Sequence, residues 1–170
     1  MSEARPVLHL LYGKAAAGKS TLARALASDG ALVIAQDHWM SRLYKEELTT
    51  VADYVRLIAR LRAAIGPHIV ELLRANLSII LDWPANTVAT RAWMKALAER
   101  GGAEARLYWL DVSDEVCLAR LSQRNASGTH EYVVTPAQFA ELSAHCEPPT
   151  DAEGIRIISE RDLPSSVQYR

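Results

Sequence analysis

Residues 13–21 read Gly13-Lys14-Ala15-Ala16-Ala17-Gly18-Lys19-Ser20-Thr21, which fits the pattern G-x-x-x-x-G-K-[ST]. An apolar run, residues 7–12, precedes this stretch, and a helix-like segment, residues 22–27, follows it. A buried strand, a tight loop and a helix in this order form a loop that holds phosphate groups. Residues 13–21, called the P-loop below, therefore predict that the chain binds a nucleoside triphosphate.

Several positions of the P-loop have a recognisable chemical task. Gly13 and Gly18 allow backbone angles and close approaches that a side chain would block. The loop amides and the N-terminal end of the following helix attract anionic phosphate. Lys19 can reach the outer phosphates, and the Ser20 hydroxyl can be a ligand of Mg²⁺. We expect residues 13–21 to form the nucleotide site, with ATP and Mg²⁺ as cofactors.

The composition is that of an ordinary globular protein. The chain has 170 residues, of which 49% are hydrophobic and 23% charged, and its net charge is −1. We expect one domain over residues 1–170, without the basic footprint of a duplex nucleic-acid-binding protein. No run approaches the length of a membrane span. The spacing of Cys117 and Cys146 fits neither a metal site nor a redox motif, so a reducing cytoplasm is the expected compartment.

Short apolar runs alternate with helical patterns along the whole chain. This alternation predicts an α/β fold of three layers, the P-loop NTPase fold, with a five-stranded parallel sheet between helices. Thr50 and Thr135 each begin a capping-box pattern, and Ser113 is a further N-cap candidate. The polar stretch at about 124–135 is expected to be a lid. The expected strands are 7–12, 31–35, 77–82, 105–112 and 155–158, and the expected helices 20–28, 39–45, 50–65, 69–76, 87–100, 113–124 and 135–146.

Three aspartates stand where predicted strands end: Asp37, Asp82 and Asp111. Ligands of parallel α/β sheets bind at the carboxyl ends of the strands, so these positions face the expected crevice. Asp37 could take the proton from an attacking hydroxyl, or it could cap the next helix. Asp82 ends a stretch that contains four apolar residues, and it could hold Mg²⁺, with a second base role possible. Asp111 precedes the Ser113 cap, which favours a structural role.

Basic and polar residues near the predicted crevice leave two interpretations open. Arg120 and Arg124 lie one helical turn apart and could fold over the phosphates, although such spacing is also typical of solvated helix arginines. Thr87 has the position of an ordinary N-cap, and Arg91 that of an ordinary helix arginine. The tryptophans could line an acceptor pocket or pack in the core; they are Trp39, Trp83 and Trp93.

Four pieces of the sequence, GKAAAGKST, QDHW, LDWPANTVATR and LARLSQRN, resemble a group of P-loop kinases. The group contains polynucleotide 5′-hydroxyl kinases, zeta-toxin-like kinases and chloramphenicol phosphotransferase, and the chain looks like a small AAA-type kinase among them. The resemblance implies that Asp37 is the general base and that Arg120 and Arg124 are lid arginines that bind phosphate. It also implies an acceptor site shaped by Asp82, Asn86, Thr87 and Arg91.

The chain departs from this pattern in two places: the usual pair of acidic residues after the second strand is reduced to Asp37-His38, and many members of the group have glycine where the chain has Ala16. We expect the P-loop to adopt angles there that suit alanine. Arg42, in the segment after Asp37, completes the expected acceptor site.

The expected function is transfer of phosphate from ATP to a hydroxyl of a small-molecule or nucleotide-like acceptor. The catalytic residues would be Lys19, Asp37, Arg120 and Arg124. Two alternatives stay open: a toxin that acts on sugar nucleotides, and a nucleotide-binding module or slow ATPase. That module would signal to a protein partner through the loops 125–134 and 147–154.

Overall fold

A computed structural model of the chain describes residues 5–128, 133–159 and 162–163. Five parallel strands form one sheet in the order β2-β3-β1-β4-β5, so the predicted α/β fold with a five-stranded parallel sheet is confirmed. Residues 129–132 of the expected lid lie outside the described residues. The strands are β1 (Val7–Tyr12), β2 (Leu32–Ala35), β3 (Ile79–Pro84), β4 (Glu104–Trp109) and β5 (Arg156–Ser159).

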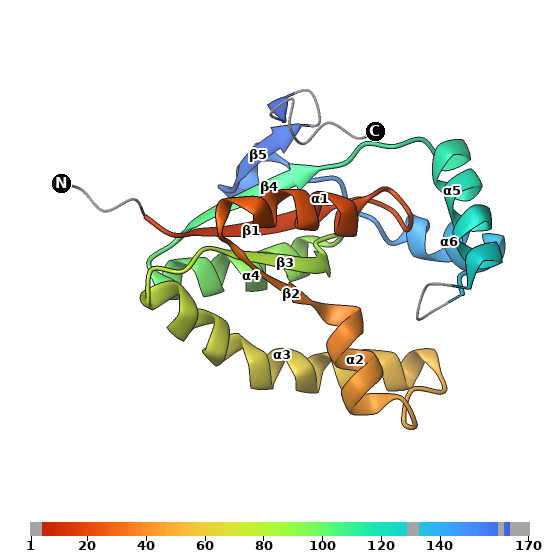
Figure 1. Ribbon diagram of the computed structural model, residues 1–170, viewed down its shortest axis with the longest axis horizontal. Helices are drawn as coiled ribbons and strands as arrows, with labels where there is room; N and C mark the ends of the chain where they lie inside the picture. Colours follow the sequence, from red (N-terminus) through yellow and green to blue (C-terminus); the bar gives the residue numbers. More distant parts are fainter. Residues whose placement is uncertain (1–4, 129–132, 160–161, 164–170) are drawn as a thin grey trace.

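Helices cover both faces of the sheet, and two of them lie beyond the carboxyl ends of the strands (Figure 1). α3 and α4 lie on one face and α1 on the other, while α5 and α6 stand at the carboxyl edge. None of the described helices combines the length and the apolar character that crossing a membrane requires. The helices are α1 (Lys19–Leu26), α2 (Gln36–Tyr44), α3 (Val51–Arg74), α4 (Val88–Gly101), α5 (Asp114–Ser127) and α6 (Pro136–Ala144), with 3₁₀ turns at Ala27–Asp29 and Asp151–Glu153.

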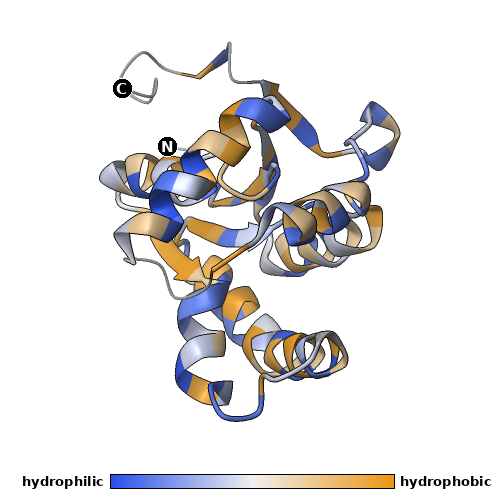
Figure 2. Ribbon diagram, turned by 90° about the vertical axis from the view of Figure 1, so that its right-hand side faces the viewer, coloured by the Kyte–Doolittle hydropathy of each residue, from blue (hydrophilic) through white to orange (hydrophobic). Residues whose placement is uncertain are grey.

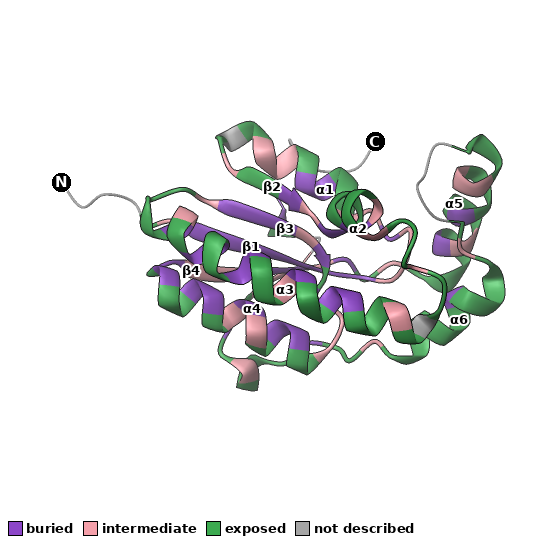
Figure 3. Ribbon diagram, turned by 90° about the horizontal axis from the view of Figure 1, so that it is seen from below, coloured by how far each residue is buried: buried purple, intermediate pink, exposed green. Residues whose placement is uncertain are grey.

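Each face of the sheet has its own hydrophobic core. One core joins the sheet to α3 and α4, and the other joins it to α1, α5 and α6. Viewed from the side of α3 and α4, much of β1 and β3 is buried while both helices alternate between buried and exposed residues (Figure 3). The hydropathy colouring shows the same mixture on the helices that are seen nearly end on (Figure 2). The apolar strand runs of the sequence therefore form the middle layer.

The predicted helix starts at Thr50, Thr87, Ser113 and Thr135 are confirmed. Each is an N-cap whose side chain accepts a hydrogen bond from the backbone N–H three residues later. Thr50 and Thr135 form complete capping boxes. These side chains satisfy amides that a helix leaves unpaired at its first turn, which is why the sequence marks these boundaries well.

The predicted break at Gly66-Pro67 is wrong, because α3 continues through both residues. Proline costs a helix one hydrogen bond, but buried apolar residues stand on both sides of it, including Ile65 and Ile69. We attribute the continuity of the helix to this burial, since packing outweighs local propensity in most protein helices.

The predicted end of the third strand at Asp82 is also corrected, because β3 runs on to Pro84.

Candidate active site

The P-loop lies at the carboxyl edge of the sheet, between β1 and α1. Gly18 is the N-cap of α1 with φ 107°, a left-handed conformation that favours glycine. A Cβ added to Gly13 would come within 3.2 Å of the Leu110 Cβ, so a side chain at this position would require its neighbours to shift. Ala16 has φ 59°, which corrects the expectation of alanine-compatible angles: the loop keeps the left-handed turn despite the side chain.

Asn86 fixes the start of the P-loop. Its side-chain Nδ2 donates to the Gly13 carbonyl at 3.0 Å, and its Oδ1 accepts from the Gly13 N–H at 3.0 Å. The neighbouring backbone N–H of Ala85 donates to the Leu11 carbonyl at 2.9 Å. The structure therefore places Asn86, an expected acceptor residue, against the phosphate loop.

Lys19 is partly buried and bound to its own loop. Its Nζ donates to the carbonyls of Gly13 and Lys14 at 2.6 and 2.8 Å. Burial lowers the pKa of the Lys19 ammonium, and the negative charge of Asp82 and, more weakly, that of Asp37 oppose this shift. The structure thus brings two predicted carboxylates within electrostatic reach of the P-loop lysine.

Asp82 stands at an irregularity of β3. Leu10 pairs with Leu81 and Leu11 pairs with Pro84, so Asp82 and Trp83 are extra residues on the side of β3 that faces β1. Such bulges redirect side chains and are frequent next to active sites. The Asp82 carboxylate and the exposed Ser20 hydroxyl are the oxygen donors that Mg²⁺ prefers.

Among the described residues, no group of three or more His, Cys, Asp or Glu side chains could hold a metal ion. A magnesium ion bound by one carboxylate, one hydroxyl, phosphate oxygens and waters fits such a site, because Mg²⁺ in nucleotide sites keeps waters and phosphate ligands.

The two arginines of α5 face the P-loop side of the molecule. Arg120 donates from Nη1 to the carbonyl of Ala17 at 3.2 Å. Burial lowers the pKa of Arg124, and the nearby Asp37 carboxylate opposes this shift. The Arg124 Nε is buried and has no hydrogen-bond partner among the described residues. Lys14 forms an ion pair with Asp114 at the start of the same helix, which raises the pKa of the lysine. Arg120 therefore contacts the P-loop, and Arg124 lies within electrostatic reach of Asp37.

Asp37 lies exposed in the first turn of α2, directly after β2. A carboxylate is favourable at this end of a helix, but the N-cap position belongs to Ala35. The electrostatic neighbours of Asp37 include Lys19 and Arg124, which come from the P-loop and from α5. The carboxylate therefore lies within electrostatic reach of two cationic groups that are expected to bind phosphate.

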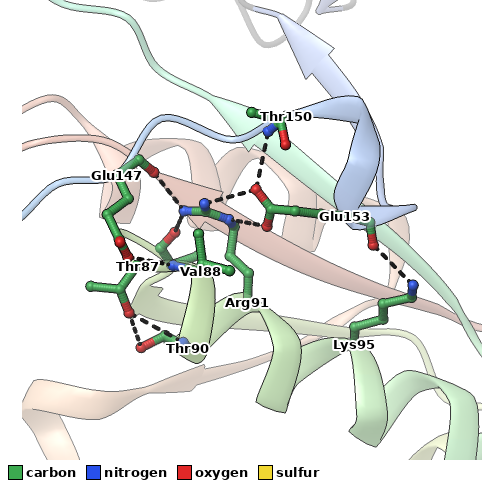
Figure 4. Close-up of polar contacts among 9 residues, drawn as sticks. Thr87, Val88, Thr90, Arg91, Lys95, Glu147, Thr150 and Glu153 are labelled. Atoms are coloured by element: carbon green, nitrogen blue, oxygen red, sulfur yellow. Dashed lines mark hydrogen bonds and ion pairs between the residues drawn. The ribbon is translucent and has the colours of Figure 1, made fainter.

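Arg91 lies away from this group. Its side chain is fully buried and binds Glu153 through two contacts, Nε to Oε2 at 2.6 Å and Nη2 to Oε1 at 2.9 Å (Figure 4). Its Nη1 donates to the carbonyls of Ala85 and Glu147 at 3.0 and 2.9 Å. The guanidinium therefore joins α4 to residues 147–153, called the strap below, instead of lying open to an acceptor.

Residues 147–154 were expected to be a loop, and the structure shows the strap hydrogen-bonded to α4. Glu147 accepts from the Val88 N–H at 2.8 Å, and Lys95 donates to the Glu153 carbonyl at 2.9 Å (Figure 4). Glu153 also accepts from the Thr150 N–H in a capping box. The pattern T-x-x-E of Thr150 and Glu153 would have indicated this capping box from the sequence, but it was not used above.

The remaining residues that were expected to bind the phosphate acceptor do not lie together in one site. Thr87 caps α4, and Arg42 is exposed in the last turn of α2. Trp83 is fully buried and stacks on Trp93, with ring centroids 5.4 Å apart, so packing explains it. Trp39 is exposed on α2.

Three comparisons place the chain among known proteins. A family model described as AAA domain (AAA_33) matches residues 8–149. No curated protein gave a significant match.

Similar solved structures include a presumed kinase from Chloroflexus aurantiacus, with a TM-score of 0.71, 18% identity, and coverage of 91% of this chain and 84% of that chain. Kti12 from Chaetomium thermophilum in complex with ADP-AlF3 has a TM-score of 0.68 and 15% sequence identity, with 96% of this chain and 94% of that chain covered. The APS kinase CysC from Mycobacterium tuberculosis, in complex with AMPPNP and APS, has a TM-score of 0.62 and 15% sequence identity, with 96% of this chain and 92% of that chain covered. At these identities the likeness shows the fold, which is that of the P-loop kinases.

Proposed function

The chain belongs to the AAA domain family AAA_33, and from this membership we propose that it is an ATP-dependent phosphotransferase. It moves the γ-phosphoryl group of ATP to a hydroxyl of a small-molecule or nucleotide-like acceptor. One observation carries the proposal: the Asp37 carboxylate lies within electrostatic reach of both Lys19 and Arg124. Phosphoryl transfer needs such an arrangement, with a base for the acceptor beside cations for the phosphates.

The P-loop binds the triphosphate. Its backbone amides and the N-terminal end of α1 hold phosphate oxygens, and Asn86 keeps Gly13 in place. The Lys19 ammonium leaves the carbonyls of Gly13 and Lys14 and pairs with the outer phosphates. Ser20 and Asp82 would hold Mg²⁺, which neutralises part of the charge on the β- and γ-phosphates.

Asp37 accepts the proton of the acceptor. A lone pair of the acceptor oxygen forms a bond to the γ-phosphorus, and the bond between this phosphorus and the β–γ bridging oxygen breaks. ADP leaves with the bonding electrons, and the hydroxyl proton passes to the Asp37 carboxylate. Arg120 and Arg124 stabilise the charge of the transferring group from α5. The products are ADP, the phosphorylated acceptor and one proton.

Release of ADP in the presence of a panel of hydroxyl compounds tests this function. We expect one class of compound to stimulate ADP release and to appear as a phosphorylated product by mass spectrometry. Hydrolysis that is equal with every compound and leaves each compound unmodified would contradict the proposal, and it would favour a nucleotide-binding module or slow ATPase instead.

A further inference from the structure

We propose that Arg62, together with Thr90 at the N-terminal end of α4, binds an anionic group of the acceptor. The acceptor is then a hydroxyl compound that also carries a carboxylate, phosphate or sulfate group. The inference rests on the proposed function, since it assigns a substrate class to the same site. It depends on Arg62, a residue of α3 that the sequence analysis did not single out.

Arg62 differs from the other arginines of its helix. Arg56 and Arg60 are exposed and approach the Glu47 carboxylate at 3.8 and 3.7 Å, and Arg56 also pairs with Asp53 at 3.2 Å. Arg62 is half-buried, and no described carboxylate lies within ion-pair distance of it. A desolvated cation without a counter-charge is unfavourable, so an anion from outside the chain would stabilise this side chain.

The contacts of Arg62 leave donors for such an anion. Its Nη2 donates to the Thr90 Oγ1 at 3.2 Å, and the guanidinium lies 5.1 Å from the centroid of the Trp93 ring. Its Nε is buried and has no hydrogen-bond partner among the described residues. Burial lowers the pKa of Arg62, as expected for a charged group that has lost water without gaining an acid. Because a planar guanidinium can bind two anionic oxygens at once, carboxylate and phosphate fit it well.

Two neighbouring side chains also have unused donors. Thr90 Oγ1 accepts from Arg62 and from the Thr87 hydroxyl, at 2.9 Å, which leaves its own hydrogen to donate elsewhere. Trp83 stacks on the same Trp93 ring, is fully buried, and has an indole N–H without a partner in the described part of the chain. Unpaired buried donors are rare in folded proteins, so their concentration around Trp93 points to a missing acceptor of hydrogen bonds.

These residues are linked to the elements that carry the proposed catalytic group and the P-loop. Tyr54, two turns before Arg62 on α3, accepts a hydrogen bond at 2.7 Å from Gln36, the residue before Asp37. Thr87 directly follows Asn86, which binds Gly13 of the P-loop. α2 and the N-terminal part of α3 lie together at the carboxyl edge of the sheet (Figure 1), and Thr87 and Thr90 mark the start of α4 (Figure 4). An acceptor held by Arg62 would therefore lie on the Asp37 side of the sheet.

The first test compares pairs of acceptors that differ by one anionic group, such as glucose with gluconate and ribose with ribose 5-phosphate. We expect kcat/KM for the anionic member of the productive pair to be higher by about tenfold or more, the gain typical of a hydrogen bond to a charged group. Equal kcat/KM for the neutral member would overturn the inference while leaving the phosphotransferase function in place.

The second test uses Arg62→Gln, with Arg60→Gln as the matched control on the exposed side of α3. We expect Arg62→Gln to raise the KM for the anionic acceptor by about 10- to 100-fold, Arg62→Lys to raise it less, and Arg60→Gln to leave it unchanged. Circular dichroism reports whether each variant is folded, and Arg62→Lys carries the test if the glutamine variant is not. Equal KM values for the Arg62 and Arg60 variants would overturn the inference.

A third measurement separates this inference from the proposed function. With the P-loop filled by magnesium and a non-hydrolysable ATP analogue, sodium sulfate is titrated while tryptophan fluorescence is recorded. We expect a saturable change in the wild type and in Arg60→Gln that is weakened in Arg62→Gln. Such binding without phosphorylation of any compound would contradict the proposed function and support the anion site. Equal fluorescence changes in the two variants would contradict the anion site and leave the proposed function untouched.

Discussion

The Lys19 ammonium donates hydrogen bonds to carbonyl oxygens that phosphate oxygens would replace when ATP binds. Its contacts with Gly13 and Lys14, at 2.6 and 2.8 Å, hold the side chain along the P-loop. Burial lowers the pKa of Lys19, and an anionic phosphate next to the ammonium would raise this pKa again. We therefore expect ATP binding to stabilise the charged form of the lysine, which burial disfavours.

Asp37→Asn tests the proposed base. The change preserves shape and removes the charge, so kcat should fall by about 10²- to 10⁴-fold, the usual contribution of general base catalysis. The affinity for ATP, measured by calorimetry, should stay within a few-fold of the wild type. Asp111→Asn, at an exposed aspartate that follows β4, is the control and should keep its activity. Loss of folding or of ATP binding in Asp37→Asn would show a structural aspartate.

Ala16→Gly tests the strain in the P-loop. A left-handed conformation costs a residue with a Cβ about 1–2 kcal/mol, whereas glycine loses about 0.5–1 kcal/mol more conformational entropy on folding than alanine does. The free energy of unfolding in urea should therefore rise by about 0.5–1 kcal/mol. Ala17→Gly, at a buried position without positive φ, should instead lower it. A loss of stability in both variants would contradict the strain at Ala16.

At the scale of elements, the strap holds the C-terminal part of the chain against α4. Residues 147–153 connect α6 with β5, and Arg91, Val88 and Lys95 of α4 each donate a hydrogen bond to them. The fully buried Arg91 is the centre of this contact, since it also pairs with Glu153. A buried ion pair that loses one partner leaves an uncompensated charge, so the strap should be sensitive to pH.

Glu153→Gln tests this sensitivity. Hydrogen bonding to Arg91 lowers the pKa of Glu153 below its ordinary value of 4.5. A lowered folded-state pKa contributes stability that is present above the unfolded-state value and is lost as the pH falls through the folded-state value. Glu153→Gln should therefore cost about 3 kcal/mol of unfolding free energy near neutral pH. The difference from the wild type should shrink progressively below about pH 4.5.

The control for this experiment is Glu141→Gln, at an exposed position of α6. Urea unfolding at a series of pH values measures both variants against the wild type. A difference between Glu153→Gln and the wild type that stays constant from neutral to acidic pH would contradict the ion pair as the source of stability.

Helix starts were the most predictable feature at this scale. Thr50, Thr87, Ser113 and Thr135 satisfy backbone amides three residues away, so the pattern and its cause lie in the same short stretch. Continuity of α3 through Pro67 was not predictable in this way, because the packing that we hold responsible comes from residues distant in the chain. The expectation for the backbone angles of Ala16 was wrong for a related reason, because the geometry of the loop prevails over the conformational preference of one residue.

At the scale of the whole molecule, the parallel sheet was predictable and the detailed contacts of its carboxyl edge were not. Alternating strands and helices indicate a parallel sheet, and the P-loop indicates where ligands approach. Contacts such as Asn86 with Gly13 and Arg91 with Glu153 join residues 73 and 62 positions apart, and no local pattern indicates them. Arg62 was not singled out for the same reason, because its contacts with Thr90 and Trp93 join residues that are distant in the chain.

The proposed function requires that the P-loop binds the triphosphate of ATP, and titration calorimetry with ATP and Mg²⁺ tests this binding most directly. The wild type should bind one ATP with a dissociation constant in the range of about 1 μM to 1 mM, where enzymes usually bind substrates. Lys19→Ala should weaken binding by about tenfold or more, the effect of losing a charged hydrogen bond. Lys45→Ala, exposed after α2, should bind ATP like the wild type. No heat of binding in the wild type, or equal affinities in the two lysine variants, would contradict the account.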